Sequence, residues 1–435
     1  MAPTKLFGDL PSNAAANIVS FDLHIPTSDV DHMRNLLKLT PVASPVYENS
    51  LPDGGRHLGL RRDWLVEAKR VWETEFDWHV TCVNSNSFAD LGCRRKTEDR
   101  VNSFPNFTAP IDDQLGSFNI HFVAFFSRRH DAVPVVMLHG WPGSFLEFLP
   151  LLELFRQKFT PETLPYHLVV PTLPGFTLSS VPPINHDISQ IDVARIMNTL
   201  MQRLGFDSYI AQGGDVGSRV ARIMAAEHDA CKAVHLNFCL INRPASATDD
   251  STLSKIEQEG VKRQAIWRAT EAAYALEHGT KPSTVGFVLS SNPVALLSWY
   301  VAPTDISFAA KHLRIGEKYL TWTDDPLPLN TILESVSLYW LSKRAHSSLW
   351  SYRHTYGPNP IPHDDPRHHI KVPMGYSYYP MELIPIPISW VATTGNLVWS
   401  KIHKKGGHFA ALEQPRDFME DLEAFIASVW SRSAQ

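Results

Sequence analysis

The N-terminal part of the chain has apolar positions at helical spacing. Phe21–Ile25 alternates apolar and polar residues as a short strand does, and it stops at Pro26. Thr27 stands where the cap of a following helix is expected. Two amphipathic stripes follow, formed by Val30, Met33, Leu36 and Leu37 and then by Trp64, Leu65, Ala68, Val71 and Trp72. We interpret these apolar residues as core positions of an N-terminal arm that packs on another part of the molecule.

From His121 onward, short apolar runs alternate with helical patterns. The runs with the length and composition of strands are residues 121–126, 133–138, 167–170, 208–211 and 233–237. Helical patterns lie between them, one of them over Ile191–Leu204. Strands that alternate with helices predict a mostly parallel sheet with crossover connections, and therefore the α/β class.

The strand pattern disappears between about residues 240 and 370. Helical patterns at Ser254–His278 and Thr331–Leu341 alternate there with proline-containing turns. This pattern predicts a helical cap that is inserted into the sheet domain.

The strand pattern returns at Ile388–Ala392, and a closing helix is predicted over Pro415–Trp430. We therefore expect four segments: an N-terminal arm over 1–110, a first core segment over 111–239, a helical cap over 240–375 and a second core segment over 376–435.

Gln212–Ser218, QGGDVGS, has the composition of a sharp turn between a strand and a helix. Gly213 and Gly217 permit such a turn, in which the residue between them has strained backbone geometry. This is the spacing of a nucleophile elbow, with Asp215 at its apex in place of Ser or Cys. A carboxylate held there is placed to attack carbon and form an ester. A solvated Asp in a glycine-rich turn is the alternative.

An aspartate at an elbow needs an oxyanion hole, a base and an acid that orients the base. The sequence His139-Gly140-Trp141-Pro142 ends a predicted strand and is a candidate for the first. The backbone N–H groups of Trp141 and Val216 are the expected donors to the oxyanion. A Gly-Pro turn around a buried Trp explains the same motif equally well.

His408 is the candidate base, because it follows two glycines just before the closing helix, late in the chain. The chain contains 20 His, so the choice of His408 as the base rests on its position in the chain. The orienting acid is expected upstream, in a loop after a late strand, where Glu382 fits. Asp364 and Asp365 are alternatives in a proline-rich loop farther back.

Composition excludes several classes of protein. The formal net charge is -5 without a long block of like charge, so nucleic-acid binding is not indicated. No apolar run approaches the roughly 18 residues that cross a bilayer, and the N-terminus lacks the apolar region of a secretory signal. The four cysteines are too sparse for a disulfide framework and suit a reducing compartment. These features predict a cytoplasmic protein.

One cluster of possible metal ligands lacks the spacing of a metal motif. Its residues lie among prolines without a helical i, i+4 pair, so no metal site is predicted. The residues are His363, Asp364, Asp365, His368 and His369.

Three motifs, in their order along the chain, resemble the microsomal-type epoxide hydrolases, especially soluble fungal members. They are HGWPGSF at His139–Phe145, GGDVGS at Gly213–Ser218 and GGHF at Gly406–Phe409. The resemblance covers most of the chain, including the arm. It implies an α/β-hydrolase fold and an enzyme that adds water to a small-molecule epoxide to give a vicinal diol. It also implies Asp215 as nucleophile, His408 as base and Glu382 as charge-relay acid.

The resemblance further implies two cap tyrosines that hold the epoxide oxygen. Tyr274 aligns with the first of them and Tyr352 with the second, and Tyr339 is the alternative for the second position. The family chemistry requires no metal or organic cofactor. The sequence leaves open which epoxide is the substrate, which stereoisomer is preferred and whether the role is detoxifying or biosynthetic. It also leaves open the oligomeric state, for which a homodimer is one possibility.

Two segments differ from the family pattern and look like insertions, namely residues 79–94 and 300–314. They are either surface loops or translated intron sequence. The second lies between Tyr274 and Tyr352, so it bears on catalytic competence. The alternatives for function are a haloalkane dehalogenase-like hydrolase with the same Asp and His, and a catalytically impaired hydrolase fold that acts as a binding protein.

Overall fold

The computed structural model describes residues 5–50, 58–78, 97–300, 327–358 and 360–430. The two predicted insertions lie outside these residues, apart from Tyr300, and so do Cys82 and Cys93.

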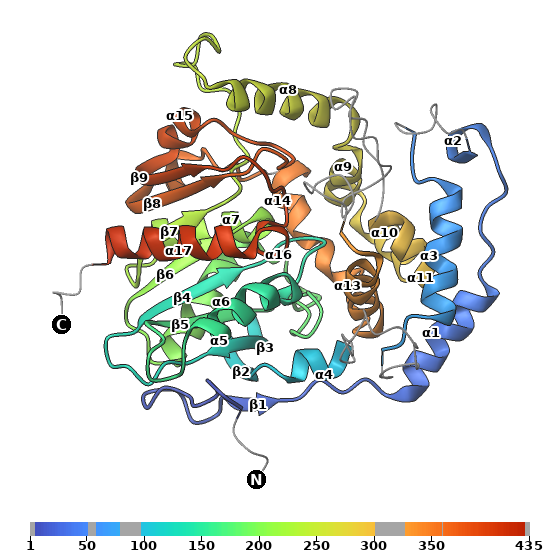
Figure 1. Ribbon diagram of the computed structural model, residues 1–435, viewed down its shortest axis with the longest axis horizontal. Coiled ribbons are helices and arrows are strands. Elements are labelled where there is room, and N and C mark those ends of the chain that lie inside the picture. Colours follow the sequence, from blue (N-terminus) through green and yellow to red (C-terminus); the bar gives the residue numbers. More distant parts are fainter. Residues whose placement is uncertain (1–4, 51–57, 79–96, 301–326, 359, 431–435) are drawn as a thin grey trace, which may run out of the picture.

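A nine-stranded sheet forms the centre of the described part of the chain, as Figure 1 shows. Its strand order is β1-β2-β3-β5-β4-β6-β7-β8-β9. The pairs from β1 to β5 are antiparallel, and those from β5 across to β9 are parallel. The strands are β1 (Val19–Phe21), β2 (Asn106–Asp113), β3 (Gly116–Phe125), β4 (Val133–Leu138), β5 (Tyr166–Pro171), β6 (Tyr209–Gly213), β7 (Cys231–Leu236), β8 (Ile370–Tyr378) and β9 (Gly395–Ile402). The predicted α/β class with a mostly parallel sheet is confirmed.

Helices cover both faces of the sheet (Figure 1). On one face, α5 (Leu149–Lys158) and α17 (Pro415–Val429) pack together, with α16 (Ala410–Glu413) beside them. On the other face, α6 (Gln190–Arg203) packs on α7 (Asp215–Glu227). Every residue of β4 and β5 is buried as a result, which explains their largely apolar sequences.

A helical segment lies between β7 and β8 in the chain and beside the sheet in space (Figure 1). It contains α8 (Lys255–Thr270), α9 (Ala273–Thr280), α10 (Pro282–Leu289), α11 (Pro293–Tyr300), α13 (Leu329–Leu341), the 3₁₀ helix η2 (Ser347–Tyr352) and α14 (Arg353–Tyr356).

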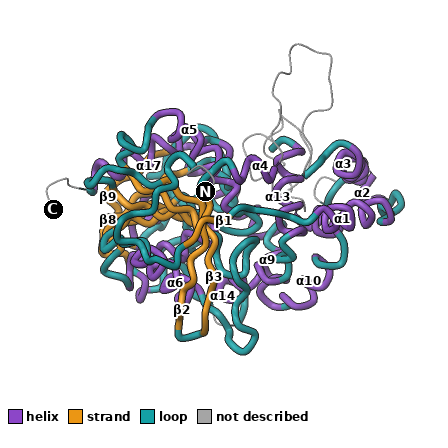
Figure 2. The backbone as a smooth tube through the Cα atoms, turned by 90° about the horizontal axis from the view of Figure 1, so that it is seen from below, coloured by secondary structure: helices purple, strands orange, loops and turns teal. Residues whose placement is uncertain are grey.

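The N-terminal arm runs along one edge of the molecule to this helical segment. After β1 it forms α1 (Thr27–Leu39), α2 (Tyr47–Ser50), α3 (Arg62–Thr74) and α4 (Thr97–Asn102). In Figure 2, α1 and α3 lie on the same side of the molecule as α10 and α13, and α1 contacts α11 and α13. The indole N–H of Trp72 donates to Ser337 Oγ of α13 at 3.0 Å, with both residues buried. The arm therefore packs on the helical segment, as the apolar stripes indicate.

The strand predicted at Ile388–Ala392 is wrong. Ile388–Val391 is the short helix α15, followed by the 3₁₀ helix η4 (Ala392–Thr394), whereas β8 precedes it and β9 follows it. Pro387 has no N–H and fixes the backbone before α15. The Ile388 N–H donates to Glu257 Oε1 at 3.1 Å and not to the carbonyl of a neighbouring strand. The β-branched composition of the run is overridden by this tertiary contact.

Two helix boundaries also differ from the prediction. The helix expected over Ser254–His278 breaks after Thr270 into α8 and α9. Thr27 is the first residue of α1, and Pro26 occupies the capping position without a side-chain bond. No helix in the described residues is long and apolar enough to cross a membrane.

Candidate active site

Asp215 occupies the sharp turn between β6 and α7. Its φ of 42° lies in the left-handed region, which is strained for a residue other than glycine. The flanking glycines are required by close backbone approach. A Cβ at Gly217 would lie 2.1 Å from the Leu138 carbonyl oxygen, and one at Gly213 would lie 2.3 Å from the Gly217 carbonyl oxygen. The turn expected from the glycine spacing is therefore present, with the carboxylate at its apex.

The turn after β4 brings a backbone donor to this carboxylate. The Trp141 N–H donates to Asp215 Oδ1 at 2.7 Å. His139 anchors the turn, because its Nε2 accepts from the Leu173 N–H at 3.1 Å. Burial lowers the pKa of His139 to about 4, which keeps the ring neutral for this contact. No donation from the Val216 N–H to Asp215 is found among the described residues, so its place in an oxyanion hole stays a prediction.

His408 bridges Asp215 and Glu382. Its Nδ1 lies 2.6 Å from Glu382 Oε1, and its Nε2 lies 3.5 Å from Asp215 Oδ2. Burial lowers the pKa of His408, but the Glu382 and Asp215 carboxylates outweigh it and hold this pKa well above its ordinary value. Asp365, one of the alternative acids, instead accepts from the Arg367 guanidinium at 2.6 Å.

Glu382 is fixed by its own loop and by α8. Its Oε1 accepts from the Leu383 N–H at 2.6 Å, and its carbonyl accepts from Arg263 Nε at 2.8 Å. The Met381 N–H donates to the Gly406 carbonyl at 3.0 Å, which ties the loop after β8 to the loop that carries His408. The loop after β8 and the loop that carries His408 therefore hold the Glu382 carboxylate next to the imidazole.

Tyr274 of α9 and Tyr352 of η2 meet edge-to-face with ring centroids 5.9 Å apart, and both line a pocket with Asp215. Burial, reinforced by the Asp215 charge, raises the pKa of both phenols well above 10, so both keep their protons. The Trp141 ring stacks on Tyr274 at 5.9 Å and meets Tyr352 edge-on at 5.7 Å. Tyr339 lies elsewhere, because its hydroxyl donates to the Gly143 carbonyl at 2.6 Å.

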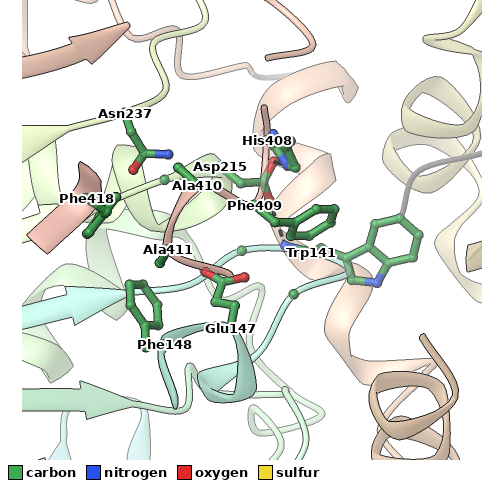
Figure 3. A pocket seen from close by; sticks show the side chains of 13 residues that line it. Trp141, Glu147, Phe148, Asp215, Asn237, His408, Phe409, Ala410, Ala411 and Phe418 are labelled. Carbon is green, nitrogen blue, oxygen red and sulfur yellow. Dashed lines mark hydrogen bonds and ion pairs between the residues drawn. The ribbon is translucent and has the colours of Figure 1, made fainter. Parts of the chain in front are cut away.

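Two small cavities adjoin Asp215. The first, which we call the tyrosine pocket, is lined by Tyr274, Tyr352 and Asp215 and has a volume of about 30 Å³. The second, which we call the rear cavity, has a volume of about 20 Å³ and is lined by Asp215, His408 and Glu147, among others (Figure 3).

Sequence reasoning missed Glu147. It belongs to the 3₁₀ helix η1 (Phe145–Phe148), directly before α5. Burial, together with the Asp215 charge, raises the pKa of its carboxyl to about 8, although the His408 charge works against the shift. The available signal was a single acid within the otherwise apolar run Phe145–Leu149.

The imidazoles of the His/Asp cluster bind to separate neighbours. His363 contacts Ser218 Oγ at 3.1 Å through Nε2, and His368 contacts Glu227 Oε1 at 2.9 Å. Among the described residues, no group of three or more His, Cys, Asp or Glu side chains is arranged to hold a metal ion.

Comparison with known proteins identifies the family. Residues 18–148 match the family described as "Epoxide hydrolase N terminus", and residues 133–250 match "alpha/beta hydrolase fold". The structure of Aspergillus niger epoxide hydrolase is 45% identical, with a TM-score of 0.86, and the match covers 98% of this chain and 100% of that chain.

Two curated proteins extend the match. A candidate epoxide hydrolase of Dothistroma septosporum is 40% identical over 421 residues, covering 96% of this chain and 91% of that protein. Epoxide hydrolase 1 of Oryctolagus cuniculus is 27% identical over 444 residues, covering 93% of this chain and 88% of that protein. The chain therefore belongs to the microsomal-type epoxide hydrolase family of the α/β-hydrolase fold, and its activity is that of an epoxide hydrolase.

Proposed function

We propose that the enzyme opens its epoxide through an ester on Asp215, which a water molecule activated by His408 then hydrolyses. The observation that supports this mechanism is that both phenols and Asp215 line one pocket, while His408 bridges Asp215 and Glu382. The phenols share the tyrosine pocket with Asp215, and the imidazole shares the rear cavity with it. The array therefore offers an acid for the first step and a base for the second.

In the first step, Asp215 Oδ2 attacks an epoxide carbon and the C–O bond of the strained ring breaks. Tyr274 and Tyr352 donate hydrogen bonds to the ring oxygen, and one phenol gives its proton to the developing alkoxide. The product is an alkyl-enzyme ester that carries a free hydroxyl group. Oδ1 becomes the ester carbonyl oxygen and keeps its hydrogen bond from the Trp141 N–H.

Esterified Asp215 no longer carries the charge that helps to hold a proton on His408, so the imidazole releases that proton to solvent and regains one when the carboxylate is restored. In the second step, water attacks Cγ of Asp215 and neutral His408 accepts one of its protons. The Trp141 N–H, and in our proposal the Val216 N–H, stabilise the tetrahedral oxyanion. The ester C–O bond then breaks, and the departing alkoxide takes the proton from His408. Asp215 releases its acid proton to solvent, and the phenolate regains one from solvent. The sum is one epoxide and one water converted to a vicinal diol, without a metal or organic cofactor.

The helical segment carries the phenols, so we also propose that residues 240–375 act as a cap over the elbow. In this division, 1–110 form the arm, and 111–239 and 376–435 form the core. The substrate in this proposal is a small epoxide that places its ring oxygen between the two phenols and its reactive carbon at Asp215.

Mass spectrometry of His408→Ala protein after incubation with styrene oxide tests the mechanism. Because this variant keeps the nucleophile and loses the base, we expect an adduct of one substrate mass and no diol. Asp215→Ala is the matched control and is expected to give neither adduct nor diol. Diol formation by Asp215→Ala would remove Asp215 from the nucleophile role.

A further inference from the structure

Glu147 points a carboxyl group at the rear cavity without a partner for it. No hydrogen bond or ion pair to this carboxyl is found among the described residues. In Figure 3 it rises from η1 toward the side on which Asp215 and His408 lie. A carboxyl group enclosed in this way is costly unless it bonds to something else in the cavity.

The rear cavity has the size and polarity for one water molecule. A buried water requires roughly 10–15 Å³ of such space and two to four polar partners. The cavity has about 20 Å³, and its polar lining includes Asp215, His408 and Glu147. It lies on the imidazole side of the elbow, whereas the tyrosine pocket has no His408 in its lining.

A larger cavity, which we call the chamber, adjoins the rear cavity. It has a volume of about 110 Å³, enough for several waters, and shares Gly143, Glu147 and Phe409 with the rear cavity. The rest of its lining is mixed. Leu146, Pro150 and Leu412 are apolar, and the polar side chains come from α4, the turn after β4 and α13, namely Arg100, Ser144, Thr331, Glu334 and Ser335. Glu147 lines both cavities and therefore stands between the chamber and the reacting groups.

We propose that Glu147 is a positioning residue that holds the hydrolytic water against His408 and Asp215, and that this water arrives from the chamber rather than through the tyrosine pocket. This inference rests on the ester mechanism proposed above. Substrate and water then reach Asp215 from different sides, so water access does not require the alkyl group to leave the tyrosine pocket.

The proposed geometry gives each atom of the water a role. One O–H donates to His408 Nε2, the other donates to a Glu147 carboxyl oxygen, and a lone pair faces Asp215 Cγ. On attack, the O–Cγ bond forms and His408 takes the first proton, while Glu147 only orients the second O–H. Glu147 accepts this hydrogen bond through its carbonyl oxygen even when the carboxyl is protonated.

Rapid-quench kinetics with styrene oxide, read by intact mass, separate the two half-reactions and test Glu147. In Glu147→Leu we expect ester formation at the wild-type rate, hydrolysis slower by about 100-fold, and accumulated ester at steady state. Glu147→Gln keeps an acceptor oxygen and is expected to recover much of the lost rate. Glu153→Gln on α5, which removes a partly exposed partner of Arg156, is the matched control and should leave both rates unchanged.

The chamber is tested separately by Thr331→Phe, which fills it from α13 and keeps Glu147 itself unchanged. We expect slower hydrolysis with unchanged ester formation, and unchanged hydrolysis would overturn the chamber as the route. Equal slowing of both half-reactions in Glu147→Leu, or no slowing, would overturn the role of Glu147. Failure of His408→Ala to form an adduct would instead count against the ester mechanism itself.

Discussion

The two oxygens of the Asp215 carboxylate lie in different surroundings. Oδ1 accepts the Trp141 N–H at 2.7 Å, whereas Oδ2 lies 3.5 Å from His408 Nε2. A donor fixed on one oxygen orients the carboxylate and leaves the other as the attacking atom. The strained φ of the residue is held by the glycine contacts on both sides, so the nucleophile is oriented before substrate binds.

The paired phenols lead to a prediction about the first half-reaction. Tyr274→Phe and Tyr352→Phe each remove one donor to the developing alkoxide, so we expect ester formation to slow by about 100-fold in each. Ester hydrolysis should change little, because neither phenol lines the rear cavity with His408. Single-turnover kinetics measure both rates. Tyr339→Phe is the comparison, and a larger loss there than in Tyr352→Phe would reverse the assignment of the second tyrosine.

The raised pKa of Glu147 predicts that the stability of the folded protein depends on pH. Burial raises its pKa from 4.5 to about 8, so the folded protein keeps a proton that the unfolded chain releases as pH rises above about 4.5. This contribution to stability is complete below pH 4.5 and is lost as pH rises through about 8. Gln cannot ionise, so the melting temperature of Glu147→Gln should rise relative to wild type over this interval and the difference should level off above it. A difference for Glu147→Gln that is flat with pH would refute the raised pKa.

At the scale of elements, the β6–α7 turn links stability to activity. In Gly217→Ala the new methyl group meets the Leu138 carbonyl, at the end of the strand that leads into the Trp141 turn. We expect a loss of about 1–3 kcal/mol in the free energy of unfolding and a strong loss of turnover. Ala226→Gly, later in α7, should lose about 0.5–1 kcal/mol with turnover retained. Wild-type turnover in Gly217→Ala would show that this close approach does not hold the site.

The elements that could be predicted from the sequence are those with local signals. The elbow depends on glycines two residues either side of Asp215, and β4 on an apolar run between turns. The order of β8, α15 and β9 could not be predicted in this way. The Ile388 N–H finds its acceptor on Glu257, far away in the chain, and no short-range pattern encodes that contact.

The candidate active-site residues also divide into those with a local sequence signal and those that depend on long-range contacts. The motif spacing pointed to Asp215, Trp141 and His408, and the structure brings these three together. The pairing of Tyr274 with Tyr352 came only from the family resemblance, because it depends on how α9 and η2 meet. Glu147 was missed because an acid in an apolar run has no stated role until its neighbours are known.

At the scale of the whole molecule, α13 connects the arm to the active-site turn. On one side it contacts the arm, through Trp72 with Ser337 at 3.0 Å and Arg100 with Glu334 at 2.6 Å. On the other, Tyr339 holds the Gly143 carbonyl of the turn that also carries Trp141. The arm therefore contributes to the position of the active-site turn although it supplies none of the proposed catalytic residues.

A double-mutant cycle between Trp72 and Ser337 measures this connection. Ser337→Ala leaves the buried indole N–H without an acceptor, so we expect a loss of about 1–3 kcal/mol in the free energy of unfolding by urea. Trp72→Phe removes the donor, together with part of a fully buried ring. In the Trp72→Phe background, Ser337→Ala should lower the free energy of unfolding by less than in the wild type. The difference is the interaction energy between Trp72 and Ser337, which we expect to be about 0.5–3 kcal/mol.

Strictly additive losses would mean that this bond does not couple the arm to α13. If the coupling is present, the single variants should also raise KM for styrene oxide, because the looser α13 no longer fixes the turn that carries Gly143 and Trp141.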